Sequence, residues 1–255
     1  MLGIPCGTRS LEPTILNAIA NLNANEGIDV SIAVSVASSL TWNFNDLWCK
    51  ALNGRKTYGI THFAMLHSDI VPEDNQWLAK LYQILVDSGK QIVSAAMPIK
   101  DNRGLTSVAF DTHPWRPLRL TMQDLAELPE TFDNDTMRRH GGFIGDRSQL
   151  QIIFNTGLWI ADVRQLWADN VVFDIRNDIR LDANGIYHAE FEPEDWLFSR
   201  WCNLHDVPYA VTKAIKAKHV GSFSFPNYGT WGTDKHDTDN MPHSTVVPRE
   251  ETPQH

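Results

Sequence analysis

Short apolar runs alternate with amphipathic segments over the first hundred residues. The apolar runs have the length and the β-branched content of strands, and they lie at residues 2–6, 29–39, 61–66 and 91–97. Between them, hydrophobic residues recur at helical spacing in residues 10–22, 42–52 and 72–85. Pro72, followed by Glu73 and Asp74, predicts the start of the third helix. Alternating strands and helices predict an α/β fold whose central sheet is mainly parallel.

The pattern breaks between residues 100 and 150. Prolines, charges and aromatic residues are scattered there, and only one short helix is predicted, near Thr121–Leu128. We therefore expect an irregular insertion that shapes a binding site. A strand follows in "LQIIFNTGLWIADV", then a helix in "EPEDWLFSRWCNLHD" and a strand in "VPYAVT". Because the sequence turns polar after Trp231, residues 1–231 are predicted as one domain and 232–255 as a flexible tail.

Composition narrows the class of protein. The chain has 255 residues, 42% hydrophobic content and a net charge of −9, which disfavours a broad nucleic-acid surface. A local basic cluster remains open, formed by Arg116, Arg119, Arg138 and Arg139. The three cysteines form no CxxC pair, so free thiols in a reducing compartment are expected. No apolar run reaches the ~18 residues of a membrane span, and the first residues lack a signal-peptide pattern, so a cytoplasmic location is predicted.

Polar residues at the ends of apolar strands are the candidates for chemistry. In "FAMLHSDIVP" a strand ends at His67 and Asp69, and ligands of α/β sheets bind at the carboxyl ends of strands. Asp69 and His219 would suit Mn²⁺ or Mg²⁺ shared with a diphosphate. Structural interpretations also stand, because Ser68 and Asp69 can cap a helix and acids in a first helical turn complement its dipole. Phosphate-loop, dinucleotide-fingerprint, HExxH and GxSxG motifs are all absent.

Four segments resemble, in order, the GT-A class of nucleotide-sugar glycosyltransferases of the family 2-like, bacterial or viral type. They are "FAMLHSDIVP", "FNTGLWIADVRQLW", "EPEDWLFSRW" and "KHVGSF". The resemblance covers roughly residues 2–226 and implies a single Rossmann-like GT-A domain. Within it, Asp69 corresponds to the acid that coordinates the metal. His67 stands where the class has another acid, and it would bind the metal, a metal-bound water or the ribose.

The resemblance also implies roles for residues elsewhere in the chain. Asn155, Thr156 and Gly157 would face the donor sugar or the acceptor. Glu194 or Asp195 would be the catalytic base of an inverting enzyme, and the late His219 would complete the metal site.

The first strand and its loop, "GIPCGTRSLEP", resemble the segment that holds the nucleotide, with Pro5, Gly7, Thr8 and Arg9 as candidates. Asn45, with Asn43, occupies the place of a nucleotide-contacting pair, and helix capping is the alternative. Trp115 and Trp159 are candidate platforms for a sugar or a base.

The implied function is metal-dependent sugar transfer from a nucleotide-diphosphate sugar, expected to be a UDP-sugar, to a hydroxyl acceptor such as a glycan or a modified base. Inverting and retaining outcomes both stay open. Two alternatives remain. "GTRSLEP" is faintly similar to the loop of sugar-phosphate nucleotidyltransferases, and the replacement of an acid by His67 fits a non-catalytic nucleotide-sugar-binding module.

Overall fold

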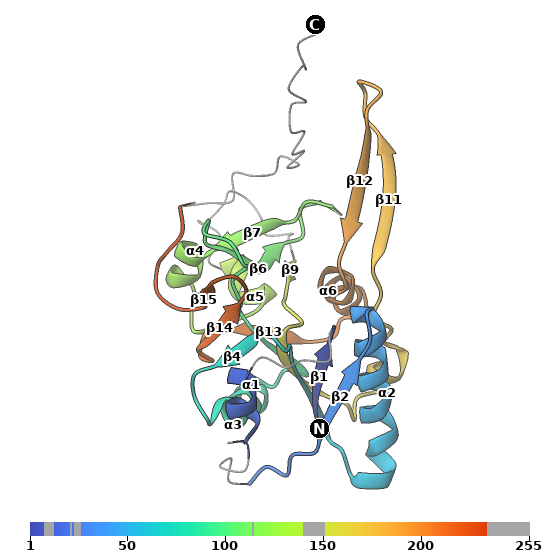
Figure 1. Cartoon of the computed structure of the whole chain (residues 1–255), viewed down its shortest axis with the longest axis vertical. Helices are drawn as coiled ribbons and strands as arrows, with labels where there is room; N and C mark the ends of the chain where they lie inside the picture. The colour runs from blue at the N-terminus through green and yellow to red at the C-terminus, as the bar shows by residue number, and fades with distance from the viewer. Residues whose placement is uncertain (8–12, 21, 23–26, 114, 140–150, 234–255) are drawn as a thin grey trace, which may run out of the picture.

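The fold is built on a central seven-stranded sheet with the strand order β2-β1-β3-β10-β5-β13-β8 (Figure 1). The structure is a computed structural model that describes residues 1–7, 13–20, 22, 27–113, 115–139 and 151–233. The sheet strands are β1 (Leu2–Cys6), β2 (Ile32–Val36), β3 (His62–Leu66), β5 (Ile92–Ala95), β8 (Thr131–Phe132), β10 (Leu158–Asp162) and β13 (Tyr209–Thr212). β10 and β8 run against the other five strands. The α/β prediction is confirmed, with a mixed sheet that is parallel only in part.

Helices cover both faces of this sheet. Alternate β3 residues point to opposite faces, so Phe63 and Met65 belong to one core cluster and Ala64 and Leu66 to the other. The first cluster includes residues of α2 (Leu40–Tyr58) and α6 (Glu194–Leu204), and the second includes residues of α1 (Pro13–Ala20) and α3 (Trp77–Ser88). Figure 1 shows the two pairs on opposite sides. Burial on both faces explains the unbroken apolar run of β3.

The third helix begins later than the sequence predicts. Pro72 does not open α3; it ends a short strand, β4 (Ile70–Pro72), which pairs with β14 (Ala217–Val220). β14 also pairs with β15 (Ser224–Pro226), which completes a three-stranded sheet. A proline lacks an N–H donor and is tolerated at a strand end, so pairing with β14 takes precedence over helix initiation.

The segment expected to be irregular is largely regular. Residues 100–139 contain β6 (Leu105–Phe110), β7 (Leu118–Thr121), α4 (Met122–Glu127), β8 and α5 (Asn134–Arg139). β7 and β6 form a sheet with β9 (Ile152–Ile153). The predicted short helix is confirmed as α4. Thr121 and Asp124 form a capping box at its N-terminus. The prediction of irregular structure was wrong because β6 is buried at every position and shows no alternation. Residues 140–150 lie outside the described part of the chain.

A two-stranded hairpin was not predicted. β11 (Arg176–Leu181) and β12 (Tyr187–Glu192) pair with each other and project from the domain (Figure 1). A short 3-10 helix, η2 (Leu166–Asn170), precedes them.

Two further expectations can be compared with the structure. All three cysteines are free, and none of the described helices is long and apolar enough to cross a membrane. The domain boundary at residue 231 stays a prediction, because residues 234–255 of the expected tail lie outside the described residues.

Candidate functional site

The His67–Asp69 segment is a turn between two strands. β3 ends at Leu66, and the Ile70 N–H donates to the His67 carbonyl at 3.1 Å, which closes the turn. The His67 N–H donates to the Gly157 carbonyl at 2.8 Å, and the Val220 N–H donates to the Asp69 carbonyl at 2.7 Å. No helix starts here, so the capping interpretation of Ser68 and Asp69 was wrong. Ser68, in the middle of the turn, is half-buried.

Asp69 lies beside His219 and Lys100. His219 Nε2, on β14, is 3.6 Å from Asp69 Oδ2, and the Lys100 ammonium forms an ion pair with the same oxygen. His219 Nδ1 lies 2.7 Å from the Pro98 carbonyl, which can only accept, so Nδ1 carries a proton and Nε2 is the ring nitrogen that faces Asp69. The Lys100 stem crosses Gly221, where an added Cβ would lie 3.0 Å from Lys100 Cδ.

Burial alone would raise the pKa of the Asp69 carboxyl. The hydrogen bonds from His219 and Lys100 outweigh that effect and hold the pKa of Asp69 well below its usual range. Asp69 is therefore ionised at neutral pH, and its negative charge is paired with the Lys100 ammonium at the carboxyl end of β3.

Two buried polar atoms of this turn, His67 Nε2 and Asp69 Oδ1, have no hydrogen-bond partner among the residues that the structure describes. The His67 ring packs edge-on to Phe44, with 5.2 Å between centroids, and burial lowers its pKa to about 4. A neutral imidazole and an unused carboxylate oxygen are atoms that a cation or a ligand donor would satisfy. In the described part of the chain, no group of three or more His, Cys, Asp or Glu side chains could hold a metal ion. A cation here would thus need ligands from a bound molecule or water.

The turn at Asn155–Gly157 joins this cluster to the start of α6. Asn155 Oδ1 accepts from the Gly157 and Leu158 N–H groups, and its carbonyl accepts from Ser94 Oγ at 2.6 Å. The buried Thr156 hydroxyl donates to Glu194 Oε1 at 3.3 Å. A Cβ on Gly157 would lie 2.5 Å from Ile70 Cδ1 and 3.5 Å from His67 Nδ1, so glycine permits this close approach.

Glu194 and Asp195 occupy the first turn of α6, where the helix dipole favours negative charge. Burial nevertheless raises the pKa of Glu194, although the Thr156 hydroxyl opposes it. Burial and the neighbouring Glu194 charge raise the pKa of Asp195 to about 7, against the pull of Arg119. This pair can therefore hold or release a proton near neutral pH.

The nucleotide candidates of the first strand are less informative. Pro5 is buried in β1 opposite Ser35, and the exposed Gly7 has open space around its Cα. Thr8 and Arg9 lie outside the described residues.

The two asparagines of α2 have structural partners. The Asn45 amide donates to and accepts from the Phe173 backbone, at 2.7 and 2.9 Å. Asn43 is buried and donates to the Cys6 and Ala37 carbonyls. Neither caps α2, because Ser39 accepts the hydrogen bond from the Trp42 N–H.

The two tryptophans predicted as platforms for a sugar or a base differ in their exposure. Trp159 is fully buried between Trp48 and Phe198, so its assignment as a sugar platform was wrong. Trp115 is half-buried, and the Arg176 guanidinium lies 4.5 Å from its ring centroid.

Lys100 was missed by sequence reasoning. It follows the predicted strand at residues 91–97 by three positions, at the same edge of the sheet as Asp69. The rule that singled out His67 and Asp69, polar residues just beyond a strand, would also have selected Lys100.

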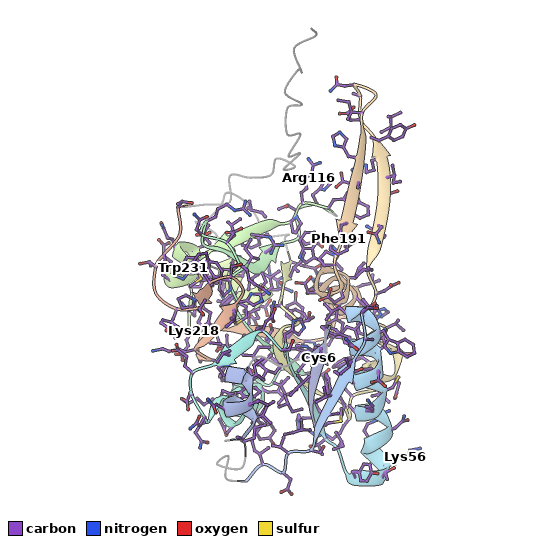
Figure 2. All side chains as sticks on the ribbon, viewed as in Figure 1. Cys6, Lys56, Arg116, Phe191, Lys218 and Trp231 are labelled. Atoms are coloured by element: carbon purple, nitrogen blue, oxygen red, sulfur yellow. The ribbon has the colours of Figure 1, made fainter. Side chains whose placement is uncertain are left out.

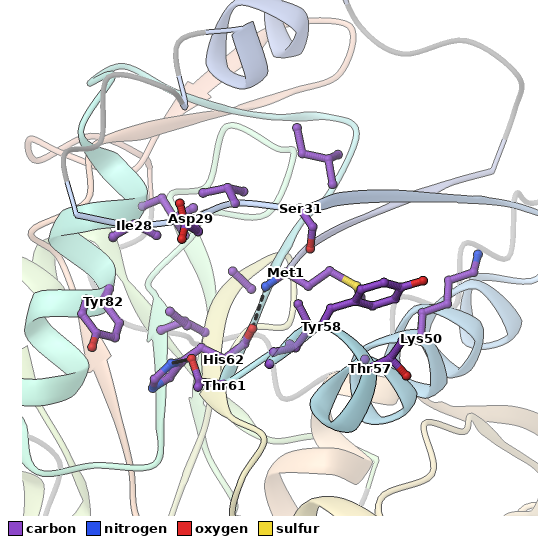
Figure 3. Close-up of a pocket in the computed structure, with 18 of the residues that line it drawn as sticks. Met1, Ile28, Asp29, Ser31, Lys50, Thr57, Tyr58, Thr61, His62 and Tyr82 are labelled. Carbon is purple, nitrogen blue, oxygen red and sulfur yellow. Dashed lines mark hydrogen bonds between the residues drawn. The ribbon is translucent and has the colours of Figure 1, made fainter.

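A large cavity, of about 1440 Å³, lies at the opposite end of the central strands from Asp69 (Figure 3). Met1, Ser31 and Thr61, at or just before the amino ends of β1, β2 and β3, line it. Among the described residues, none of the buried side-chain atoms that lack a hydrogen-bond partner belongs to the lining of this cavity. The group of His67, Asp69, Lys100 and His219 at the carboxyl end of β3 is therefore the stronger candidate site.

Comparison with known proteins gives a likeness in fold. No family model and no curated protein matches the sequence. Among solved structures, the crystal structure of A197 from STIV superposes with a TM-score of 0.52 at 12% sequence identity. The match covers 86% of this chain and 84% of A197. At this identity the likeness concerns the fold alone.

Proposed function

We propose that the chain is a GT-A type glycosyltransferase that moves a sugar from a nucleotide-diphosphate sugar to a hydroxyl acceptor. The observation that carries the proposal is the pairing of two sites across one turn. The Gly157 carbonyl accepts a hydrogen bond from the His67 N–H, and the Thr156 hydroxyl donates one to Glu194. An ionised carboxylate beside an imidazole thus lies on one side of the turn, and a carboxylate pair of raised pKa lies on the other.

Asp69 and His219 are the residues that would hold Mn²⁺ or Mg²⁺, with the free Asp69 Oδ1 as the strongest unused ligand atom. Bonding of His219 Nδ1 to a carbonyl is the usual support of a metal-ligating histidine. Magnesium commonly takes one or two protein ligands and completes its shell with phosphates and water. When bound, such a cation would neutralise charge that develops on a departing diphosphate.

The chain's own residues account for the remaining steps. Asn155–Gly157 would form the floor beneath the donor sugar, because Gly157 leaves that surface without a side chain. Lys100, once released from Asp69, would bind a diphosphate oxygen. Asp195 or Glu194 would take the proton of the acceptor hydroxyl as that oxygen bonds to the sugar carbon and the diphosphate leaves with its electron pair. A product with retained configuration would exclude this single-displacement scheme.

A glycan hydroxyl is the acceptor that we favour over a modified nucleic-acid base. Arg116 and Arg138 of the basic cluster are paired with Glu190 and Asp135, which reduces their charge toward phosphates. A UDP-sugar is the proposed donor. The free cysteines suit a reducing cytoplasm, of a host cell if the chain is viral.

A thermal-shift and turnover screen of UDP-, GDP- and dTDP-sugars with and without Mn²⁺ tests the proposal. We expect one donor to raise Tm only with metal and to be hydrolysed slowly. Asp69→Ala should lose both effects, while Asp87→Ala, an exposed acid on α3, should keep them. If no nucleotide sugar shifts Tm in either condition, the proposal fails.

One observation favours a non-catalytic nucleotide-sugar-binding module as the second candidate. Lys100 already neutralises Asp69, so a nucleotide could bind through the lysine without metal. Donor binding without turnover across many acceptors would select this module. Release of pyrophosphate from a nucleoside triphosphate and a sugar phosphate would instead identify a nucleotidyltransferase.

A further inference from the structure

The β11–β12 hairpin has one apolar face and one charged face. On one face, Asn177 pairs with Phe191, Ile179 with Ala189 and Leu181 with Tyr187. On the other, Arg176 pairs with Glu192, Asp178 with Glu190 and Arg180 with His188. The four large apolar side chains of the first face are exposed by 51–73%.

The charged face, not the apolar face, contacts the domain. Glu192 is buried and forms ion pairs with Arg200 of α6 and with Arg176. Arg116, which precedes β7, reaches Glu190 at 3.4 Å. Figure 2 labels Phe191 on the hairpin and Arg116 in the neighbouring segment. A hairpin that needed only its own domain would bury its apolar face there instead.

An isolated two-stranded hairpin is at best marginally stable, and no third strand joins this one in the described part of the chain. Contiguous exposed apolar side chains on such a ribbon mark an interaction surface. We propose that a second copy of this chain packs its own hairpin against this apolar face, to form a two-fold symmetric dimer.

A second copy fits because the surface is self-complementary. A two-fold axis through the ribbon sets the same apolar residues against each other. The charged residues of β11 and β12 lie on the opposite face, so like charges do not meet at the contact. A nucleic acid is a poor occupant, since this face carries no cation.

The area available predicts a weak dimer. Aromatic side chains bury about 150–250 Å² each, so the exposed fractions of Tyr187 and Phe191 offer roughly 200–300 Å². Ile179 and Leu181 add roughly 100 Å² or more, since an aliphatic side chain offers about 60–120 Å². Ile175, the residue just before β11, is exposed by 39%. The total for two copies is roughly 600–1,000 Å², at or below the lower limit of specific interfaces, so we expect a weak dimer with a Kd in the micromolar range.

Sedimentation equilibrium of the full chain over a wide concentration range tests this proposal. The native protein should dimerise with a micromolar Kd, and Ile179→Glu should weaken the dimer at least tenfold. The matched control is Arg180→Glu, the next residue on the opposite face, which should leave the Kd within a factor of two. Circular dichroism melting would establish that each variant folds. If Ile179→Glu does not fold, Tyr187→Ser takes its place in the test.

A native protein that stays monomeric to several hundred micromolar overturns the proposal, and so does a dimer that Ile179→Glu leaves intact. Flotation with vesicles of neutral and anionic lipid distinguishes the other occupant. Vesicle binding by a monomeric native chain, lost in Ile179→Glu, would assign the face to a lipid surface and not to a second copy. The inference does not depend on the proposed enzymatic function.

Discussion

The ion pair between Lys100 and Asp69 gives a sharp test of the proposed cation site. Lys100→Met keeps an unbranched stem that can cross Gly221 and removes only the ammonium. If the lysine occupies the oxygen that a metal needs, the variant should bind Mn²⁺ more tightly than the native protein. It should also bind UDP more weakly when metal is absent, because the tethered cation is gone.

The magnitude follows from the exposure of the pair. The two side chains are 38% and 32% exposed, so solvent screens the attraction and the pair contributes about 1 kcal/mol at most. Without the ammonium, an arriving dication neither displaces that contact nor meets a nearby positive charge. Together the two effects amount to about 1–2 kcal/mol, which corresponds to roughly 5–30-fold tighter Mn²⁺ binding.

Electron paramagnetic resonance of free Mn²⁺, or calorimetric titration, measures this affinity without nucleotide or turnover. The matched control is Lys218→Met on β14, because Lys218 pairs with Glu73 at a similar exposure of 43% and 31%. The control should leave the Mn²⁺ Kd unchanged. Unchanged or weaker Mn²⁺ binding by Lys100→Met would refute the idea that lysine and metal compete for Asp69.

Three further predictions concern the turn, the carboxylate pair and α2. Because the pKa of Asp195 is raised to about 7 from an ordinary 3.8, stability should fall as pH rises from about 4 to 7, and Asp195→Asn should flatten that decline in Tm against pH. Gly157→Ala should lower stability by about 1–3 kcal/mol, because its Cβ meets Ile70, and should weaken donor binding in calorimetry. Asn45→Ala loses two hydrogen bonds to the Phe173 backbone, so urea denaturation should show a loss of about 1–3 kcal/mol with unchanged donor affinity.

Local periodicity was enough to predict the α/β class and the main strands and helices of the central layers. It could not predict that β10 runs against its neighbours, because strand direction is decided by long-range pairing. It also misplaced the start of α3, since Pro72 satisfies the rules for a first helical turn and for a strand end alike.

The candidate site was predicted in part. The structure brings Asp69 and His219 together, as the implied metal site requires. It also connects Thr156 with Glu194, a contact that no motif predicted. The sequence could not show that Asn45 has a structural role and not a nucleotide-binding one, because its hydrogen-bond partner Phe173 lies 128 residues away. Trp159 illustrates the same limit, since composition does not distinguish a core tryptophan from a sugar platform.

The base of the hairpin lies next to the carboxylate pair. β12 ends at Glu192 and α6 begins at Glu194, with Pro193 alone between them. Arg200 of α6 binds Glu192, so the hairpin and the helix are connected both through Pro193 and through this ion pair. Six residues of strand make an arm of about 20 Å. A partner bound along the apolar face of this arm would therefore lie within about 20 Å of the first turn of α6, which carries Glu194 and Asp195.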